Sequence, residues 1–321
     1  MKKYDVITIG GSTEDFSFTV DDYVVINNKL DPLKEKLVAF EYGSKVGIKN
    51  IVPSFGGGAA NTAVALARLG LKTAVITSLA KDEAGKRILA NFKKHRIDCR
   101  FVQMNSGARS GQSLVMKTMT NEHVLFTYRG ANDALVINHK LEKKLTKAKR
   151  IYLASLTGNW KATLNAIISS RVKLAWNPGR KQLAAGFSAL KTFLAHTDIL
   201  ILNKDEAREL VISATKNNKI LPLNVMLRKL RSLGPNTVVI TEGDKGAVAF
   251  NGKKIFRQLA FKTKAADTTG VGDAFGATFV AMIDHGFDLT KSLRLAAKNS
   301  ASVVAKPGAQ HGLLSKSQLG L

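Results

Sequence analysis

The sequence has little cysteine, few acidic residues and no long uninterrupted hydrophobic run. Its single cysteine, Cys99, cannot form an intramolecular disulfide, so a reducing compartment, the cytoplasm, is the expected location. No apolar stretch reaches the roughly 20 residues that a membrane-spanning helix needs, so no membrane segment is predicted. The apolar residues near the N-terminus are interrupted by Asp5 and end at Gly10, which is too short a run for a secretory signal.

Two familiar ligand-binding patterns are also missing. Histidine and cysteine do not occur at zinc-binding spacing, so a structural zinc site is not expected. A G-x-x-x-x-G-K-[ST] loop is absent, which excludes a Walker-type nucleotide site on the basis of motif.

Acidic residues are outnumbered: 49 lysines and arginines face 24 aspartates and glutamates, for a net charge of +25. Such a field favours anionic partners, whether nucleotide, phosphorylated metabolite or nucleic acid. The densest basic run, His139 to Arg150, carries Leu141 and Leu145 at helical spacing, which favours a solvated helix face. Nucleic-acid binding is not expected, because neither interleaved aromatic residues nor a known reading module accompanies the charge.

Short β-rich runs alternate with helical stretches through most of the 321 residues. The runs are 5–10, 72–80, 150–155, 172–179, 198–203 and 236–243. This order predicts an α/β fold with a mostly parallel central sheet and helices on both faces, in a single domain spanning 1–321. Ligands in such folds bind at the carboxyl ends of the strands.

Two stretches, about 13–50 and 108–130, instead show the period-two alternation of half-exposed strands. They are predicted to form a small β-sheet that covers one end of the domain as a lid, with a hairpin turn at "TNE" (120–122). Exposed strands favour pairing with another subunit, so a homodimer through the lid is expected.

The segment "AADTTGVGDAFGATF" (265–279) places Gly270 and Gly272 directly before an apolar helix pattern, with Asp273 at its opening. Backbone N–H groups at a helix start, together with the helix dipole, form an anion site, and glycine permits a ligand to approach the backbone. Asp273 is then either a carboxylate beside a bound phosphate or simply the N-cap of the helix.

The segment "DTTGVGD" (267–273) resembles the C-terminal signature of the ribokinase (PfkB) family of carbohydrate kinases, which includes nucleoside kinases. "FGGGAANTAVALARLG" (55–70) is similar to the N-terminal signature of that family, and the order and separation also fit. The resemblance implies a ribokinase-like three-layer fold and an ATP-dependent kinase that transfers the γ-phosphoryl group to a primary hydroxyl of a sugar. A nucleoside acceptor remains open, and a non-catalytic sugar- or nucleotide-binding protein is a further alternative.

The resemblance also implies the catalytic roles. Asp273 is expected to be the general base, with the amides of Gly270, Val271, Gly272 and Asp273 itself forming the anion hole. Phosphoryl transfer depends on positioning and charge neutralisation, which is consistent with this set.

Nucleotide and magnesium contacts are implied for several polar residues that follow strands. Asn203 and Glu206, in the pattern N-x-x-E, are expected to organise Mg²⁺ and the phosphates of ATP largely through water. Alternatively, Glu206 only opens a helix. Expected contacts to ATP come from Thr241, Gly243, Gly246 and Asn299, although a β-turn also explains the glycines and Asn299 is alternatively a solvent-facing helix residue.

The acceptor pocket is implied at the N-terminal end of the chain. Asp15 is expected to bind substrate hydroxyls, with Gly56, Gly57 and Asn61 in the same pocket, although a tight turn feeding a helix also explains the last three. Arg129 is either a contact for an acidic or phosphorylated substrate or a surface residue.

The resemblance further implies a monovalent cation, K⁺, held by Asp267 and Thr269 with backbone near Val304 and Gly308. The sequence departs from the family where ribokinase itself has a lysine in the first glycine cluster, because this chain has Gly58 there.

Overall fold

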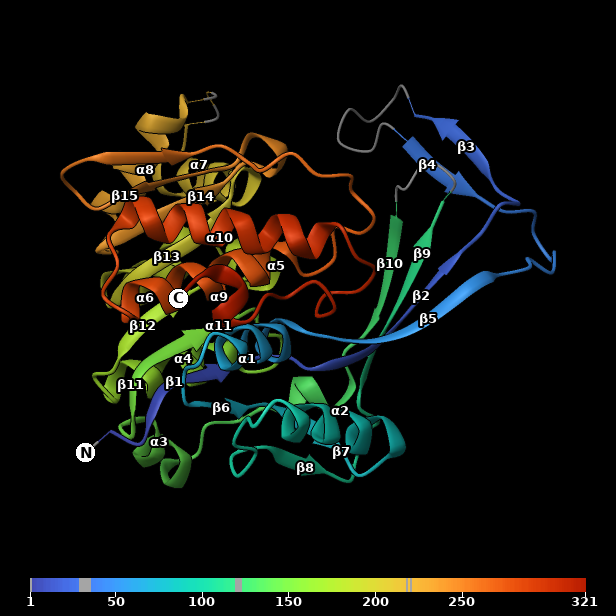
Figure 1. Cartoon of the computed structure of the whole chain (residues 1–321), viewed down its shortest axis with the longest axis horizontal. Coiled ribbons are helices and arrows are strands. Elements are labelled where there is room, and N and C mark those ends of the chain that lie inside the picture. The colour runs from blue at the N-terminus through green and yellow to red at the C-terminus, as the bar shows by residue number, and fades with distance from the viewer. Residues whose placement is uncertain (1, 29–35, 119–122, 218, 220) are drawn as a thin grey trace.

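An eight-stranded sheet forms the centre of the computed structural model, which describes residues 2–28, 36–118, 123–217, 219 and 221–321 (Figure 1). The strand order is β16-β15-β14-β13-β12-β11-β1-β6, and the pairs from β6 to β14 are parallel while those from β14 to β16 are antiparallel. The strands are β1 (Tyr4–Ile9), β6 (Thr73–Ile76), β11 (Ala148–Leu153), β12 (Lys173–Trp176), β13 (Thr197–Asn203), β14 (Thr237–Thr241), β15 (Ala247–Phe250) and β16 (Ile255–Gln258). The predicted mostly parallel sheet is confirmed.

Helices cover both faces of this sheet, as predicted. One face packs against α1 (Gly58–Arg68), α2 (Glu83–Lys94), α9 (Val271–Asp284), α10 (Leu289–Val304) and α11 (Lys316–Leu319). The other packs against α3 (His139–Leu145), α4 (Trp160–Ser169), α5 (Arg180–Ala184), α6 (Gly186–Ala195), α7 (Lys204–Thr215) and α8 (Leu223–Ser232). In β1, Val6 belongs to the first core while Ile7 and Ile9 belong to the second, and all three are fully buried. A strand buried on both faces reads as a continuous apolar run, which is why these strands were recognisable.

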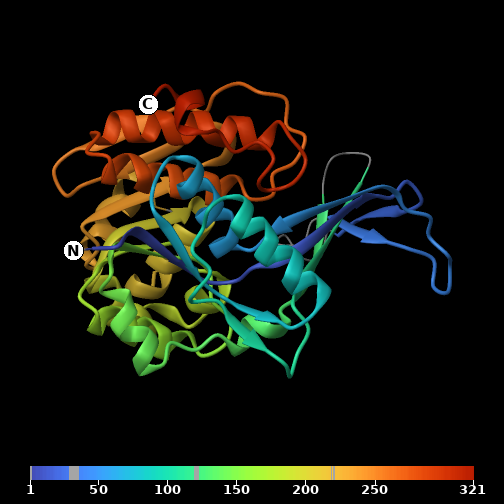
Figure 2. The same cartoon turned by 60° about the horizontal axis from the view of Figure 1, so that its bottom comes forward.

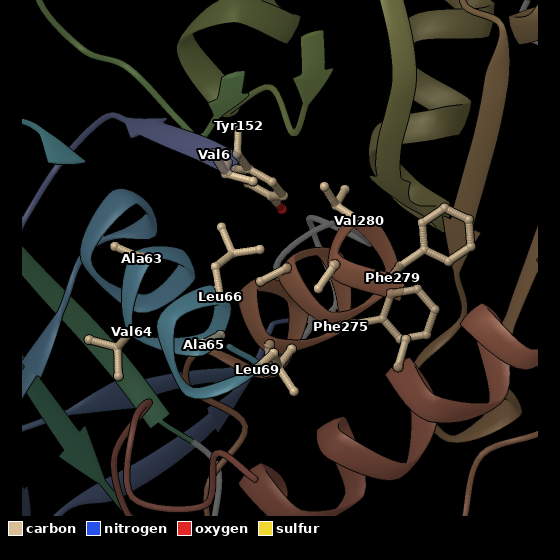
Figure 3. Packing of buried hydrophobic residues seen from close by; sticks show 14 of the residues in the cluster. Val6, Ala63, Val64, Ala65, Leu66, Leu69, Tyr152, Phe275, Phe279 and Val280 are labelled. Atoms are coloured by element: carbon tan, nitrogen blue, oxygen red, sulfur yellow. The ribbon is translucent and has the colours of Figure 1, made fainter. Parts of the chain in front are cut away.

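Helices α1 and α9 pack closely against each other over the sheet (Figure 3). Leu66 of α1 and Leu69, which directly follows this helix, belong to one buried cluster with Phe275 and Val280 of α9, and the Tyr152 side chain lies near Leu66. This packing brings the first turns of α1 and α9 together, although they lie more than 200 residues apart in the chain.

A second, four-stranded sheet projects from the main body in both views (Figures 1 and 2). Its order is β10-β9-β2-β5, from β2 (Thr13–Thr19), β5 (Lys49–Gly56), β9 (Gly111–Lys117) and β10 (His123–Tyr128). A separate exposed pair, β3 (Val24–Asn27) with β4 (Lys36–Ala39), lies at its far end. We call the four strands the small sheet. The predicted small sheet is therefore present, and the predicted "TNE" turn at 120–122 lies outside the described residues.

One predicted element is wrong in its extent. The run 72–80 was expected to be a single strand, but it divides into β6 in the central sheet and β7 (Ser78–Ala80). Strand β7 pairs instead with β8 (Gln103–Asn105), away from the central sheet. Burial does not mark the break, because every residue of both strands is buried.

Candidate functional site

The opening of α9 is accessible to solvent and carries Asp273. The N-cap is Gly270, in the left-handed region with φ of 73°, and Asp273 is the third residue of the helix. The alternative that Asp273 caps the helix is therefore wrong. A Cβ on Gly270 would lie 2.3 Å from Cβ of Ala309, so glycine is needed there for space as well as conformation. Gly272 is exposed and Asp273 half-buried, so the amides of these two residues can meet a ligand, while the Val271 amide donates to the Thr268 carbonyl oxygen at 3.5 Å.

The Asp273 carboxylate is held by a chain of three side-chain amides. Asn61 Nδ2 donates to Asp273 Oδ2 at 2.8 Å, and Gln310 Nε2 donates to Asn61 Oδ1 at 3.0 Å. Asn91 Nδ2 in turn donates to Gln310 Oε1 at 2.9 Å. Each amide thereby fixes the orientation of the next, and the last one presents a donor to the carboxylate.

Burial raises the pKa of Asp273 to about 6, against the lowering effect of the Asn61 hydrogen bond and with a further rise from the charge of Asp15. Two other groups feel the charge of Asp273: Glu206, whose pKa is raised mainly by burial, and the buried Tyr152 hydroxyl, whose pKa is also raised. A carboxylate with a pKa near neutrality, placed in the first turn of a solvent-accessible helix start, is suited to accept a proton.

Asp15 lies on β2 and is almost fully buried. Burial raises the pKa of its carboxyl group, although hydrogen bonds from Thr13 and Ser113 oppose the rise. A Cβ on Gly56 would lie 1.8 Å from Asp15 Oδ2, so the carboxylate occupies the space that a side chain on β5 would need. The structure thus brings Gly56 against Asp15, whose charge contributes to the raised pKa of Asp273.

The remaining residues of the first glycine cluster lie beside these two carboxylates. Gly57 is the N-cap of α1, with φ of 87°. A Cβ on Gly58 would lie 3.6 Å from Asp273 Oδ1 but only 2.7 Å from Cβ of Ala154. The position at which ribokinase itself has a lysine therefore adjoins the carboxylate, and Ala154 closes it to any side chain.

Asn203 and Thr241 end two neighbouring parallel strands and are paired in register. Asn203 Oδ1 accepts from the Glu206 amide and Glu206 Oε2 accepts from the Asn203 amide, both at 2.8 Å, in a reciprocal capping box. The alternative that Glu206 opens a helix is therefore confirmed. The capping box uses one carboxylate oxygen of Glu206, and carboxylate oxygens are among the ligands that Mg²⁺ accepts.

The nucleotide residues expected beyond β14 and on α10 are placed as follows. Gly243 lies in a one-turn helix after β14. A Cβ on Gly246 would lie 2.0 Å from the Gln258 carbonyl oxygen, so the turn between β14 and β15 requires glycine at this position. Asn299 is fully buried, donating to Thr278 Oγ1 and accepting from the Leu314 amide. Asn299 therefore neither faces solvent nor has a free amide for adenine, and we correct that assignment to a structural role.

Asp267 and Thr269 do not fit the expected monovalent cation site. The Asp267 carboxylate accepts from Lys117 Nζ at 2.8 Å and from the amides of Thr269 and Gly308 at 2.9 Å each. An ammonium group already neutralises the carboxylate that would bind the ion.

Arg129 is exposed where β10 meets the main body, and Gly111 lies against its backbone carbonyl at the base of the small sheet. In the described part of the chain, histidine, cysteine and acidic residues form no group of three that could hold a metal, so Mg²⁺ here would need water and phosphate ligands. None of the described helices combines the length and apolar character required to cross a bilayer.

Sequence reasoning missed Gln310 and Lys117. Their contacts join residues 249 and 150 positions apart, and a lone glutamine or lysine carries no recognisable pattern.

Comparisons with known proteins identify similar chains. The model of the pfkB family of carbohydrate kinases matches residues 21–316. The chain is 26% identical over 324 residues to the ATP-dependent 6-phosphofructokinase of Thermoanaerobacterium thermosaccharolyticum, covering 96% of this chain and 90% of that protein. Two solved structures share the fold: the nucleoside kinase of Methanocaldococcus jannaschii (TM-score 0.77, 21% identity, 98% and 97% coverage) and the Arabidopsis thaliana ribokinase complexed with ribose and ATP (TM-score 0.80, 20% identity, 98% and 97% coverage).

Proposed function

Because the chain belongs to the pfkB family of carbohydrate kinases, we propose that it transfers the γ-phosphoryl group of ATP to a primary hydroxyl of a sugar. The observation that carries this proposal is the half-buried Asp273 carboxylate at the opening of α9, with a pKa of about 6 and an anion-binding helix start beside it.

In the proposed reaction, the acceptor oxygen attacks the γ-phosphorus and gives its proton to Asp273. The bond from the γ-phosphorus to the bridging oxygen breaks, and ADP leaves with that electron pair. The amides of Gly270, Val271 and Gly272 bind the transferring group, where charge is spread over its oxygens. Mg²⁺, when bound with ATP near Asn203 and Glu206, supplies neutralising charge.

Asp15 is proposed to hold the acceptor, with Gly56 and Gly57 allowing its close approach, and Asn61 is proposed to serve the same pocket through its hydrogen bond to Asp273. Asp15 is a buried acceptor of hydrogen bonds, which suits the hydroxyls of a polyol. Thr241, Gly243 and Gly246 are proposed to contact ATP, and Arg129 an anionic part of the acceptor. We propose that the small sheet acts as a lid that limits water during transfer, and that the single Cys99 reflects a cytoplasmic location.

The test is ADP formation measured with ATP and Mg²⁺ across pentoses, hexoses, sugar acids, sugar phosphates and nucleosides. We expect one sugar class to raise the rate of ADP formation well above the rate without acceptor. A rate that no acceptor increases would contradict the kinase assignment.

A nucleoside acceptor is the second candidate. It is favoured by the departure at Gly58, where the lysine of ribokinase is replaced and Ala154 leaves no room for another side chain. In the same panel, stimulation by nucleosides and by no free sugar would select this alternative.

The amide chain that ends at Asp273 leads to a prediction about pH. Activity requires ionised Asp273, so kcat/KM should fall as pH drops through about 6. In Gln310→Leu, Asn61 loses its orienting donor and its own donor to the carboxylate weakens, so the pKa of Asp273 should rise by about 1 unit and the acid limb should shift upward.

The pH–rate profile measures this shift. Gln258→Leu is the matched control, because the Gln258 amide donates to the exposed backbone at Leu259. A Gln310→Leu profile that coincides with the control profile would show that the amide chain does not tune Asp273.

We propose that two subunits associate through the small sheet and the β3–β4 pair. A two-stranded pair is unstable alone, and Val24 and Ile26 of β3 are 62% and 47% exposed. Sedimentation should give twice the chain mass for the wild type and the single-chain mass for Val24→Asp/Ile26→Asp. Val136→Asp, at a comparably exposed apolar site outside these strands, should leave the mass unchanged; a monomeric wild type at micromolar concentration would refute the dimer.

A further inference from the structure

A buried ion pair joins the small sheet to the loop that leads into α9. Lys117, the last residue of β9, places Nζ 2.8 Å from Asp267 Oδ2. The Asp267 side chain is 3% exposed and the Lys117 side chain 17%. This pair is therefore largely withdrawn from solvent, unlike the pair between Lys49 on β5 and Asp21 beyond the end of β2, whose side chains are 65% and 44% exposed.

In the described part of the chain, the hydrogen bonds to the Asp267 carboxylate come from protein groups: Lys117 Nζ and the amides of Thr269 and Gly308. Burial alone would raise the pKa of Asp267, but hydrogen bonds from Lys117, Gly308 and Thr269 outweigh it and the pKa is lowered. The Val304 carbonyl, expected to bind a cation, instead accepts the amides of Ala266 and Asp267 at 2.8 and 3.1 Å. The Gly308 amide donates to the Asp267 carboxylate at 2.9 Å.

We propose that the Lys117 ammonium takes the place of a monovalent cation at Asp267, so that the protein needs no K⁺. This inference rests on the proposed kinase function. An ammonium group offers a compact positive charge to a carboxylate, as K⁺ would, but it is delivered by a strand of the small sheet.

The Lys117–Asp267 ion pair lies next to the turn that begins α9. Asp267 Oδ1 accepts from the Thr269 amide, and the next residue, Gly270, is the left-handed N-cap of α9. The carboxylate therefore fixes the turn from which the proposed anion hole begins. Gly308 is also in contact with the small sheet, since a Cβ there would lie 3.1 Å from Ser54 Cβ on β5. Lys117 is thus a positioning residue that couples seating of the small sheet to the geometry of this turn.

The experiment compares chloride salts of K⁺ and N-methylglucamine at equal ionic strength. Wild type should show less than about a twofold difference in kcat between them. Lys117→Met, which keeps the length of the side chain without its charge, should lose about tenfold or more in N-methylglucamine and regain activity in K⁺ or NH₄⁺. Lys117→Arg should keep its cation independence, and Lys49→Met is the matched control that should behave as wild type.

A second readout does not depend on catalysis. Without nucleotide or acceptor, the Tm of Lys117→Met should rise with K⁺ concentration, while the Tm of wild type should not. Strong K⁺ activation of wild type, or a Lys117→Met variant that matches Lys49→Met in both readouts, would overturn the proposal. If no acceptor supports ADP formation, the kinase assignment fails but the melting curves still decide whether Lys117 replaces the cation. If Lys117→Met does not fold, K⁺ dependence of the wild-type and Lys117→Arg melting curves decides it.

Discussion

Asp273→Asn is expected to lower kcat by about 10²- to 10⁴-fold, the usual contribution of a general base. The substitution keeps the shape of the side chain and an oxygen that can accept from Asn61, so the amide chain can persist. ATP binding should be retained because the backbone donors at the opening of α9 are unchanged. Steady-state kinetics with the acceptor found in the panel, together with ATP titration, measure the two effects.

The thermal stability of Asp273→Asn distinguishes loss of the general base from damage to the fold. The folded-state pKa of Asp273, about 6, lies above the ordinary aspartate value of 3.8, so its favourable contribution to stability exists at low pH and is lost as pH rises through about 6. At pH 8 the buried charge is a cost, and Asp273→Asn should melt no lower than wild type.

Asp284→Asn, at the other end of α9, is the matched control. Asp284 pairs with the buried Arg150, which also contacts Asp198. This variant should lose about 1–3 kcal/mol of unfolding free energy while keeping its activity. Undiminished turnover in Asp273→Asn would remove the general base from the mechanism.

Asp15→Asn is expected to raise the KM for the acceptor by about 100-fold, since it weakens two charge-assisted hydrogen bonds to substrate hydroxyls, worth roughly 3 kcal/mol together. The KM for ATP should change little. The pKa of Asp15 is raised, like that of Asp273, so its ionised form destabilises the fold at pH 8. Removing this charge should therefore not lower Tm at pH 8.

Asp21→Asn, at an exposed position beyond the end of β2, controls for a general effect of losing a carboxylate. Acceptor KM values that are equal in Asp15→Asn and Asp21→Asn would contradict the acceptor role of Asp15.

The sequence predicted the central architecture because the strands are buried on both faces, and such strands give short apolar runs separated by helices. It did not predict the division of 72–80, since β6 and β7 are equally buried and differ only in which strand each one meets. Strand partners are set by the tertiary arrangement, which periodicity does not encode.

In the candidate site, too, features set by local sequence were predicted and features set by tertiary contacts were not. Asp273 and the glycines before it were found because their spacing in the chain is itself the chemistry of a helix start. Asn299 was misplaced because a polar residue on a helix is recognised by type, while its burial against Thr278 depends on how α9 and α10 pack. Gln310 and Lys117 escaped notice because they act through contacts with residues distant in the chain.

The close contact between Gly58 and Ala154 constrains how the first glycine cluster of this protein can be altered by design or by descent. A lysine introduced at Gly58 alone places its Cβ 2.7 Å from the rigid methyl group of Ala154. Replacement of Ala154 by glycine removes that obstacle, so it must come first or at the same time. The two positions are epistatic, and only one order of single substitutions leads to a ribokinase-like first glycine cluster without passing through a sterically blocked intermediate.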